Sequence, residues 1–280
     1  MIRLRRPDFS QRDALGKVIE GIIQDVGLRQ KVENEEAMFH DWSLRYTEHL
    51  ERAELYNFAA IQRVFGQLTA EDIEKLYPGY FARDKKPARD IYDAIKNEAS
   101  GECPLCGGLG FPENLDHYLP KKQFSQFSVL PLNLVPACRD CNMGAKGQAY
   151  AVKADDQAIN PYESATHFFD EQWIYARYDP TNTDEPGVLA YYVNPPEHWS
   201  ESDKARVHFH FDTFELARKY SVKAAQELPF VLRQIQAWID RNISYDDIKE
   251  LLFVPVIDSS PFINQWKRCM YQALCDHNFD

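Results

Sequence analysis

Hydrophobic residues recur at helical intervals over much of the first hundred residues. In the stretch "ALGKVIEGIIQDV", residues 14–26, apolar positions follow one another after three or four residues. This spacing predicts an amphipathic helix. The apolar positions of the stretch are Leu15, Val18, Ile19, Ile22 and Val26.

The stretch "AEDIEKLYPGYFARDKKPARDIYDAIKNEA", residues 70–99, predicts two further helices. Pro78 and Gly79 are typical of a turn between them, and the second helix is expected to begin near Pro87. This second helix runs directly into "SGECPLCGG". We therefore expect it to pack against the cysteine-containing segment that follows.

Regular periodicity weakens between residues 101 and 150, where Gly, Pro and Cys dominate, as expected where a metal replaces part of a core. Beyond this segment, "QWIYARYD" and "GVLAYYVNP" predict two strands separated by the polar, turn-rich "PTNTDEP". In "RVHFHFD", His208 and His210 alternate with aromatic residues, which predicts a half-buried strand rather than a metal site.

The last part of the chain predicts helices again. The stretch "DTFELARKYSVKAAQELPFVLRQIQAWIDRN" is typical of one long helix or of a helix pair interrupted near Pro229, and "FINQWKRCMYQALCDH" of a final amphipathic helix. Cys269, Cys275 and His277 lie on that final helix, where a buried free cysteine is ordinary. We assign no chemistry to them.

Composition narrows the class of protein. The chain has 280 residues, of which 44% are hydrophobic, as in an ordinary globular protein. It contains no apolar run long enough for a membrane span, and the basic N-terminal residues precede no apolar segment of a signal peptide. We therefore expect a cytoplasmic protein that does not bind a membrane.

Cysteine spacing predicts a structural zinc site. Four of the six cysteines form two pairs, each separated by two residues, namely Cys103 with Cys106 and Cys138 with Cys141. Such pairs can share one tetrahedral zinc ion, and four thiolates leave no position for a substrate. Four unrelated buried cysteines are the alternative. A redox dithiol is disfavoured because no βαβ pattern surrounds the pairs.

Between the cysteine pairs lie polar residues that a zinc clamp does not explain. Phosphodiester hydrolysis needs a base near neutral pH, and the imidazole of His117 is suited to that task. Asp116 and Asn142 offer hard oxygen ligands for Mg²⁺ or Mn²⁺. Taken singly, an Asp-His pair is more often a surface turn, and an Asn before a helix is often only a cap.

The ordered set "CPLC" at 103–106, "DHYLP" at 116–120, Asn133 in "PLNLVPAC" and "CRDCN" at 138–142 resembles the HNH endonucleases. The resemblance covers about fifty residues. It implies a ββα-metal fold that holds one divalent ion between a hairpin and a short helix. It also implies that His117 is the general base, that Asp116 and Asn142 bind the catalytic metal, and that Asn133 fastens the loop carrying the base.

Basic residues in and near this segment are candidates for contacts with DNA phosphates. They are Lys121, Lys122, Arg139 and Lys146, of which Lys146 matches the basic residue that often follows the last motif Asn. The stretch "RDKKPARD" just upstream either extends this track or forms a solvated helix start. The net charge of −11 limits unaided DNA binding, because phosphate contacts supply much of the affinity.

The flanks of the motif also resemble bacterial proteins that have a central HNH module. The stretches that carry this resemblance are "NPYESATHFFDEQWIYARYDP", "YYVNPPEHW" and "NQWKRCMYQAL". This resemblance implies an effector of restriction or anti-phage defence that works beside an ATPase or another sensor protein. A one-metal site of this kind nicks one strand, or cuts both strands as a homodimer.

These interpretations together predict an α+β protein with helical N- and C-terminal regions around a small zinc-clamped ββα module, followed by a short strand pair. The expected regions are residues 1–98, 99–150 and 151–280. The leading hypothesis is a metal-dependent DNA endonuclease. A zinc-stabilised nucleic-acid- or protein-binding scaffold without catalysis and a nuclease acting on RNA are the alternatives.

Overall fold

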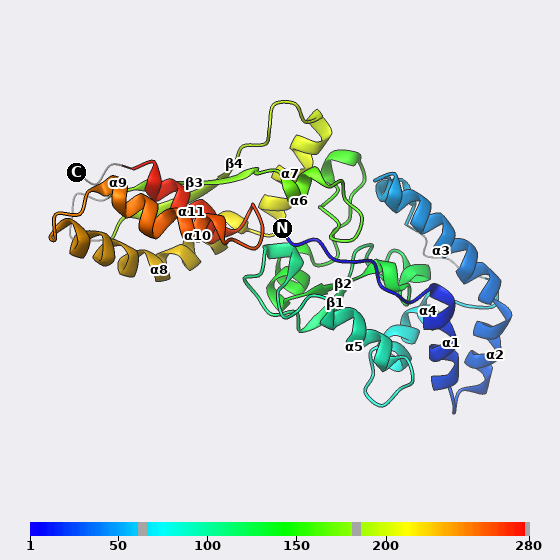
Figure 1. The fold of residues 1–280 in the computed structure, drawn as a ribbon. Helices are drawn as coiled ribbons and strands as arrows, with labels where there is room; N and C mark the ends of the chain where they lie inside the picture. The colour runs from blue at the N-terminus through cyan, green and yellow to red at the C-terminus, as the bar shows by residue number, and fades with distance from the viewer. Residues whose placement is uncertain (61–65, 181–185, 278–280) are drawn as a thin grey trace. The chain divides into compact units, whose positions relative to one another are not determined.

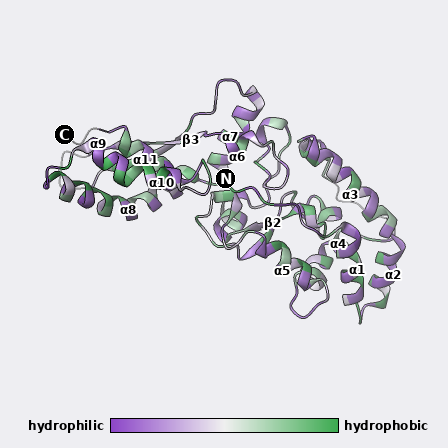
Figure 2. Ribbon diagram, viewed as in Figure 1, coloured by the Kyte–Doolittle hydropathy of each residue, from purple (hydrophilic) through white to green (hydrophobic). Residues whose placement is uncertain are grey.

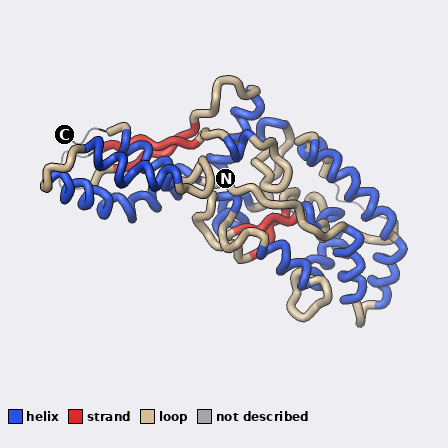
Figure 3. Tube along the Cα trace, viewed as in Figure 1, coloured by secondary structure: helices blue, strands red, loops and turns tan. Residues whose placement is uncertain are grey.

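The computed structural model describes residues 1–60, 66–180 and 186–277. The chain divides into two compact units, one of Arg3–Ser164 and one of Met1–Ile2 with Ala165–Asp280. Both are helical and each contains one pair of antiparallel strands among the described residues (Figures 1 and 3). The predicted α+β class with helical ends is confirmed.

The first unit begins with helices packed around a common core. Its α-helices are α1 (Gln11–Gly21), α2 (Val26–Asn34), α3 (Glu36–Glu51), α4 (Ala70–Leu76) and α5 (Arg89–Asn97). Helix α1 starts at a capping box, in which Ser10 and Asp13 satisfy each other's backbone N–H groups. The predicted apolar face of α1 is buried, whereas Val26 is 69% exposed because α1 ends at Gly21 and α2 begins at Val26.

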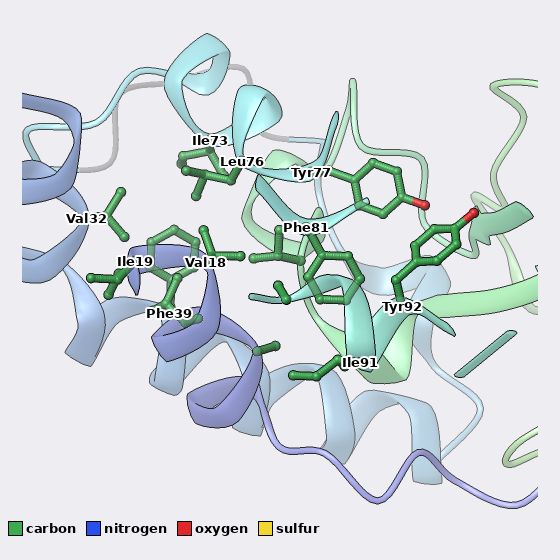
Figure 4. Packing of buried hydrophobic residues seen from close by; sticks show 14 of the residues in the cluster. Val18, Ile19, Val32, Phe39, Ile73, Leu76, Tyr77, Phe81, Ile91 and Tyr92 are labelled. Atoms are coloured by element: carbon green, nitrogen blue, oxygen red, sulfur yellow. The ribbon is translucent and has the colours of Figure 1, made fainter. Parts of the chain in front are cut away.

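The turn expected at Pro78 and Gly79 is instead helical. Residues Tyr77–Phe81 form the π-helix η2, which continues directly from α4. Tyr77 and Phe81 thereby reach the same core as α1, α3 and α5, as Figure 4 shows. Helix α5 packs against β1 and β2, as the sequence predicted.

The first strand pair consists of β1 (Asn114–His117) and β2 (Leu134–Ala137). Leu115 and Leu134 belong to the same hydrophobic cluster as the N-terminal helices. The module from residue 99 to 150 therefore shares its core with the helical region before it. Its short helices are η3 (Pro104–Cys106), η4 (Ser125–Phe127), η5 (Pro131–Asn133) and the π-helix η6 (Asp140–Lys146), and η7 (Ala154–Asp156) follows it.

Pairing within this hairpin leaves some backbone groups facing outward. The Tyr118 N–H donates to the Asn133 carbonyl, so these two residues form a hydrogen-bonded pair. Along an antiparallel ladder, hydrogen-bonded pairs alternate with pairs that are not hydrogen-bonded to each other. The backbone groups of Leu115 and His117 on β1 and of Leu134 on β2 therefore face away from the partner strand. Each of these three carbonyls accepts a side-chain hydrogen bond instead, from Tyr77, Lys146 and Tyr162 respectively.

The second unit contains α6 (His167–Asp170), β3 (Ile174–Asp179), β4 (Val188–Val193), α7 (Glu201–Thr213), α8 (Leu216–Ile239), α9 (Tyr245–Ile248), η8 (Lys249–Phe253), α10 (Val254–Asp258) and α11 (Trp266–Cys275). The two predicted strands and the final helix are confirmed. Strand β3 pairs with β4, and α8 and α11 pack on this hairpin. Most of the predicted turn between the strands lies outside the described residues.

One prediction for the second unit is wrong. "RVHFHFD" lies in helix α7, which Ser200 caps at its N-terminus, and His210 is buried while His208 is exposed. Alternation over so few residues does not separate a strand from a helix. Of the two alternatives for the stretch around Pro229, one long helix is confirmed, because α8 continues through this residue. The helix begins at Leu216, after Glu215, which adopts a left-handed conformation with φ of 51°.

Hydrophilic and hydrophobic residues alternate along the helices of both units (Figure 2). Among the described residues, no helix is both long enough and apolar enough to span a bilayer.

Candidate active site and cysteine cluster

The four paired cysteines converge on one point. The sulfur atoms of Cys103, Cys106, Cys138 and Cys141 all lie within 4.8 Å of one another, and none of these cysteines forms a disulfide. The Cys106 and Cys138 sulfurs are 4.0 Å apart. Thiolates bound to a tetrahedral zinc ion lie about 3.8 Å apart, given a zinc–sulfur bond of about 2.3 Å. The cluster is therefore compatible with structural zinc.

Glycine residues let the chain bend tightly around this cluster. Gly107 and Gly108 follow the first cysteine pair with φ of 63° and 82°, which side-chain-bearing residues rarely adopt. A Cβ atom on Gly110 would lie 2.8 Å from the Cys138 sulfur. The Cys103 N–H donates to the Gly110 carbonyl at 2.9 Å, which closes the first knuckle.

Three of the four predicted catalytic residues lie around one pocket of about 290 Å³ in the first unit. Asp116 and His117 from the end of β1, Asn142 from η6 and Lys121 all line it. Tyr77, Ala82 and Tyr92 of the N-terminal region also line the pocket.

His117 is held as a neutral imidazole. Its Nε2 lies 2.9 Å from the carbonyl oxygen of Ser128, which can only accept a hydrogen bond, so Nε2 carries the proton. The other ring nitrogen, Nδ1, consequently keeps its lone pair. Burial lowers the pKa of His117 to about 3, against the smaller opposing effect of the Ser128 bond. The side chain is therefore an unprotonated base at neutral pH.

Asp116 forms a buried ion pair with Lys146. The Lys146 ammonium lies 2.9 Å from Asp116 Oδ2 and donates to the His117 carbonyl at 2.6 Å. Burial raises the pKa of Asp116, and the charge of Lys146 opposes this shift. Lys146 was predicted to contact a DNA phosphate, but its ammonium is instead engaged by these two oxygen atoms within the protein.

Asn142 faces β1 from the π-helix η6. Its amide Nδ2 donates to Asn114 Oδ1 at 2.6 Å. This bond uses an amide hydrogen and leaves the Asn142 Oδ1 as an acceptor. Asp116 and Asn142 both line the pocket, and carboxylate and amide oxygens are the hard donors that Mg²⁺ or Mn²⁺ prefers. The residues present thus fit a divalent cation.

Asn133 ties together the loop that follows β1. Its side chain is fully buried. Its Oδ1 accepts hydrogen bonds from the Leu119 N–H at 2.8 Å and the Tyr46 hydroxyl at 3.0 Å. Its Nδ2 donates to the carbonyls of Leu119 and Phe127 at 3.0 and 3.1 Å. Asn133 does not line the pocket, and its contacts are those of a residue that fixes the loop carrying Lys121.

The remaining predicted basic residues differ in position. Lys121 is half-buried at the pocket, and burial lowers its pKa. Lys122 and Arg139 are exposed and lie outside the residues that line the pocket. Several further residues contact the site although no sequence motif marks them, namely Tyr46, Tyr77, Tyr92, Asn114 and Ser128. Residues 46, 77 and 92 lie outside the motif, so no local pattern marks them.

Comparison with known proteins identifies the family of the chain. The chain is 39% identical over 223 residues to a protein of Escherichia phage lambda, Protein ea31, and the alignment covers 76% of this chain and 74% of that protein. No family model matches the chain, and no solved structure matches it. With this identity and coverage, the chain belongs to the family of the phage lambda protein ea31.

Proposed function

We propose that this protein is a metal-dependent endonuclease of the HNH type that hydrolyses phosphodiester bonds in DNA. The observation that carries the proposal is the arrangement at one pocket of Asp116, Asn142 and His117, whose Nε2 is bound to the Ser128 carbonyl and whose Nδ1 is left as an acceptor. A buried histidine in a purely structural role has no need of two hard metal donors beside it.

His117 acts as the general base in the proposed reaction. Its Nδ1 takes a proton from a water molecule, whose oxygen forms a new bond to the phosphorus atom. One ester P–O bond breaks, and the departing oxygen is protonated by solvent. The carbonyl of Ser128 orients the imidazole and stabilises the positive charge that the ring gains.

Asp116 and Asn142 would hold a divalent cation, Mg²⁺ or Mn²⁺. Such an ion would supply positive charge that stabilises the transition state and the departing oxygen. Lys146 holds the Asp116 carboxylate and the end of β1 in place. Lys121 contributes a further positive charge at the pocket for the substrate phosphate.

The four cysteines would hold zinc as a structural ion, and this zinc fixes the helix that presents Asn142. Cys141 immediately precedes Asn142 in η6.

The geometry of the catalytic side chains favours an enzyme over the scaffold alternative, since a scaffold does not require a neutral, oriented imidazole. An RNA substrate stays the alternative on the substrate side. The role beside an ATPase or sensor in anti-phage defence, and the homodimer, stay predictions.

Plasmid cleavage tests the proposal directly. Supercoiled DNA is incubated with the full-length protein in Mg²⁺, Mn²⁺ or EDTA, and nicked and linear products are quantified over time. The His117→Ala variant is expected to lose at least about 100-fold in rate, because a general base contributes factors of this size. Zinc content and thermal unfolding of the variant establish that it is folded.

The matched control is His208→Ala, which removes an exposed histidine from α7 in the other unit. It is expected to cleave at the wild-type rate. Cleavage by His117→Ala near the wild-type rate, or cleavage that persists in EDTA, would contradict the proposal. A single-stranded RNA and a single-stranded DNA of the same sequence, assayed in parallel, separate the two substrate classes.

A further inference from the structure

Tyr77 joins the N-terminal helical region to the proposed catalytic pocket. It lies at the start of η2, lines the pocket and is nearly buried. Its aromatic ring and its hydroxyl contact three different parts of the site. The HNH-like motif does not include this residue, which precedes the first motif cysteine by 26 residues.

The first contact is with the proposed general base. The rings of Tyr77 and His117 meet nearly edge to face, with centroids 4.4 Å apart and an interplanar angle of 68°. The Ser128 carbonyl fixes one nitrogen of the imidazole, but a single hydrogen bond leaves the ring free to swing about that bond. The Tyr77 ring blocks that movement from one side. Both contacts together define the direction of Nδ1.

The second contact is with the half-buried cation of the pocket. The Lys121 ammonium lies 5.1 Å from the centre of the Tyr77 ring, within the range of a cation–π interaction. Lysine is a flexible side chain that loses substantial rotamer entropy when it is fixed. The ring therefore holds the ammonium at the pocket before a substrate arrives, which lowers the entropic cost of binding a phosphate there.

The Tyr77 ring is itself fixed from two directions. Its hydroxyl donates to the outward-facing Leu115 carbonyl at 3.2 Å, and Tyr92 also bonds to the Leu115 backbone. Figure 4 shows both tyrosines with their hydroxyl groups pointing out of the hydrophobic cluster in the same direction. The Tyr77 ring also stacks against the ring of Phe81 in that cluster.

We propose that Tyr77 is a positioning residue whose single ring sets both the orientation of His117 and the place of the Lys121 ammonium, which contacts a phosphate of the DNA substrate. This inference rests on the proposed function, because it assigns His117 and Lys121 their roles in phosphodiester hydrolysis. It also means that the helical region before the motif completes the active site.

DNA binding without metal tests the Lys121 part of the proposal. Binding of a short fluorescent duplex in EDTA is measured by anisotropy for the wild type, Tyr77→Leu, Lys121→Met and the double variant. Tyr77→Leu is expected to weaken binding by about 2- to 30-fold, the range of one cation–π contact. The double variant should bind no more weakly than Lys121→Met alone.

Cleavage kinetics test the His117 part. Tyr77→Leu is expected to lower kcat by about 10- to 100-fold, because a displaced base loses alignment with the attacking water. Tyr77→Phe keeps the ring and should retain most of kcat, with a smaller loss from the unsatisfied Leu115 carbonyl. The matched control is Tyr80→Leu, which removes a half-buried tyrosine ring from the same helical turn, where it contacts Lys86 outside the pocket.

Folding is checked for every variant by zinc content and cooperative unfolding. If Tyr77→Leu fails this check, Tyr77→Met takes its place, because Met keeps much of the buried volume without an aromatic face. Equal behaviour of the Tyr77 and Tyr80 variants, or additive losses of affinity with Lys121→Met, would overturn the inference. So would a wild type that does not bind DNA.

The two proposals can fail separately. A wild type that binds DNA but cleaves it with neither Mg²⁺ nor Mn²⁺ would remove the nuclease function. In that case, a non-additive binding cycle would still establish that Tyr77 positions Lys121. Normal cleavage with an unchanged kcat in Tyr77→Leu would leave the nuclease function intact and remove the positioning role.

Discussion

The two hairpins of this protein have the same antiparallel pairing but differ in how they are buried and stabilised. In β3–β4, inward and outward side chains differ in burial, and α8 and α11 cover one face. In β1–β2, seven of the eight residues are buried, and only Asn114 is partly exposed. A two-stranded hairpin is at best marginally stable alone. The comparison shows that β1–β2, which is shorter and carries the candidate site, depends on the cysteines and on neighbouring helices.

Loss of the cysteine cluster should produce the largest difference between the stabilities of the two hairpins. In Cys103→Ser, zinc is expected to be absent, because structural zinc contributes on the order of 10 kcal/mol to the folding of small modules. The part of the chain around β1–β2 should lose its protection from hydrogen exchange, whereas β3–β4 should keep it. Zinc analysis and exchange mass spectrometry of both hairpins measure this outcome.

Cys269→Ser is the control, since this buried thiol lies on α11 and contacts the Ile174 carbonyl of β3. It should retain full zinc content. If Cys103→Ser keeps both its zinc and the protection of β1, the cysteine cluster does not clamp the hairpin.

Removal of Asn133 should have an intermediate effect confined to the first unit. Asn133→Ala breaks four buried hydrogen bonds and leaves the Leu119 N–H and other groups without partners. We expect a loss of about 3–5 kcal/mol in the free energy of unfolding, measured with urea. Tyr46→Phe removes one of the same bonds and should cost about 1 kcal/mol. Equal losses in the two variants would show that the loop is not anchored by Asn133.

The smallest effect is expected on the second hairpin. Tyr192 is half-exposed on β4, and its ring stacks on the ring of Tyr175 across the strand pair at 6.1 Å. Tyr192→Ala should reduce the free energy of unfolding by less than about 1 kcal/mol, the usual value of one cross-strand pair. DNA cleavage should be unchanged. A large loss of cleavage would show that β3–β4 takes part in the activity.

The sequence predicted what depends on local patterns. Helical spacing located α1, strand composition located β3 and β4, and the order of cysteines and polar residues selected Asp116, His117 and Asn142, which line one pocket. Contacts over long sequence separations were not predictable in this way. Tyr46 and Tyr77 reach the site only because the helices that carry them share a core with Leu115 and Leu134.

Local patterns also failed where two structures suit the same residues. Pro78 and Gly79 are typical of a turn, yet their segment continues α4 as a π-helix, because Tyr77 and Phe81 are buried in the core. π-Helical segments often occur at functional sites. Here η2 and η6 supply Tyr77 and Asn142 to the same pocket. Lys146 was predicted to contact a DNA phosphate because of its position in the motif. That position does not indicate that its side chain is buried beside Asp116.

The capped carbonyls of β1–β2 also affect how this protein can associate with other chains. An exposed strand edge normally offers unpaired N–H and C=O groups that another strand can join. On β1, the outward carbonyls of Leu115 and His117 are already taken by Tyr77 and Lys146. On β2, Tyr162 occupies the Leu134 carbonyl, and Pro136 has no N–H to donate. The hairpin therefore resists sheet extension, and with it edge-to-edge aggregation.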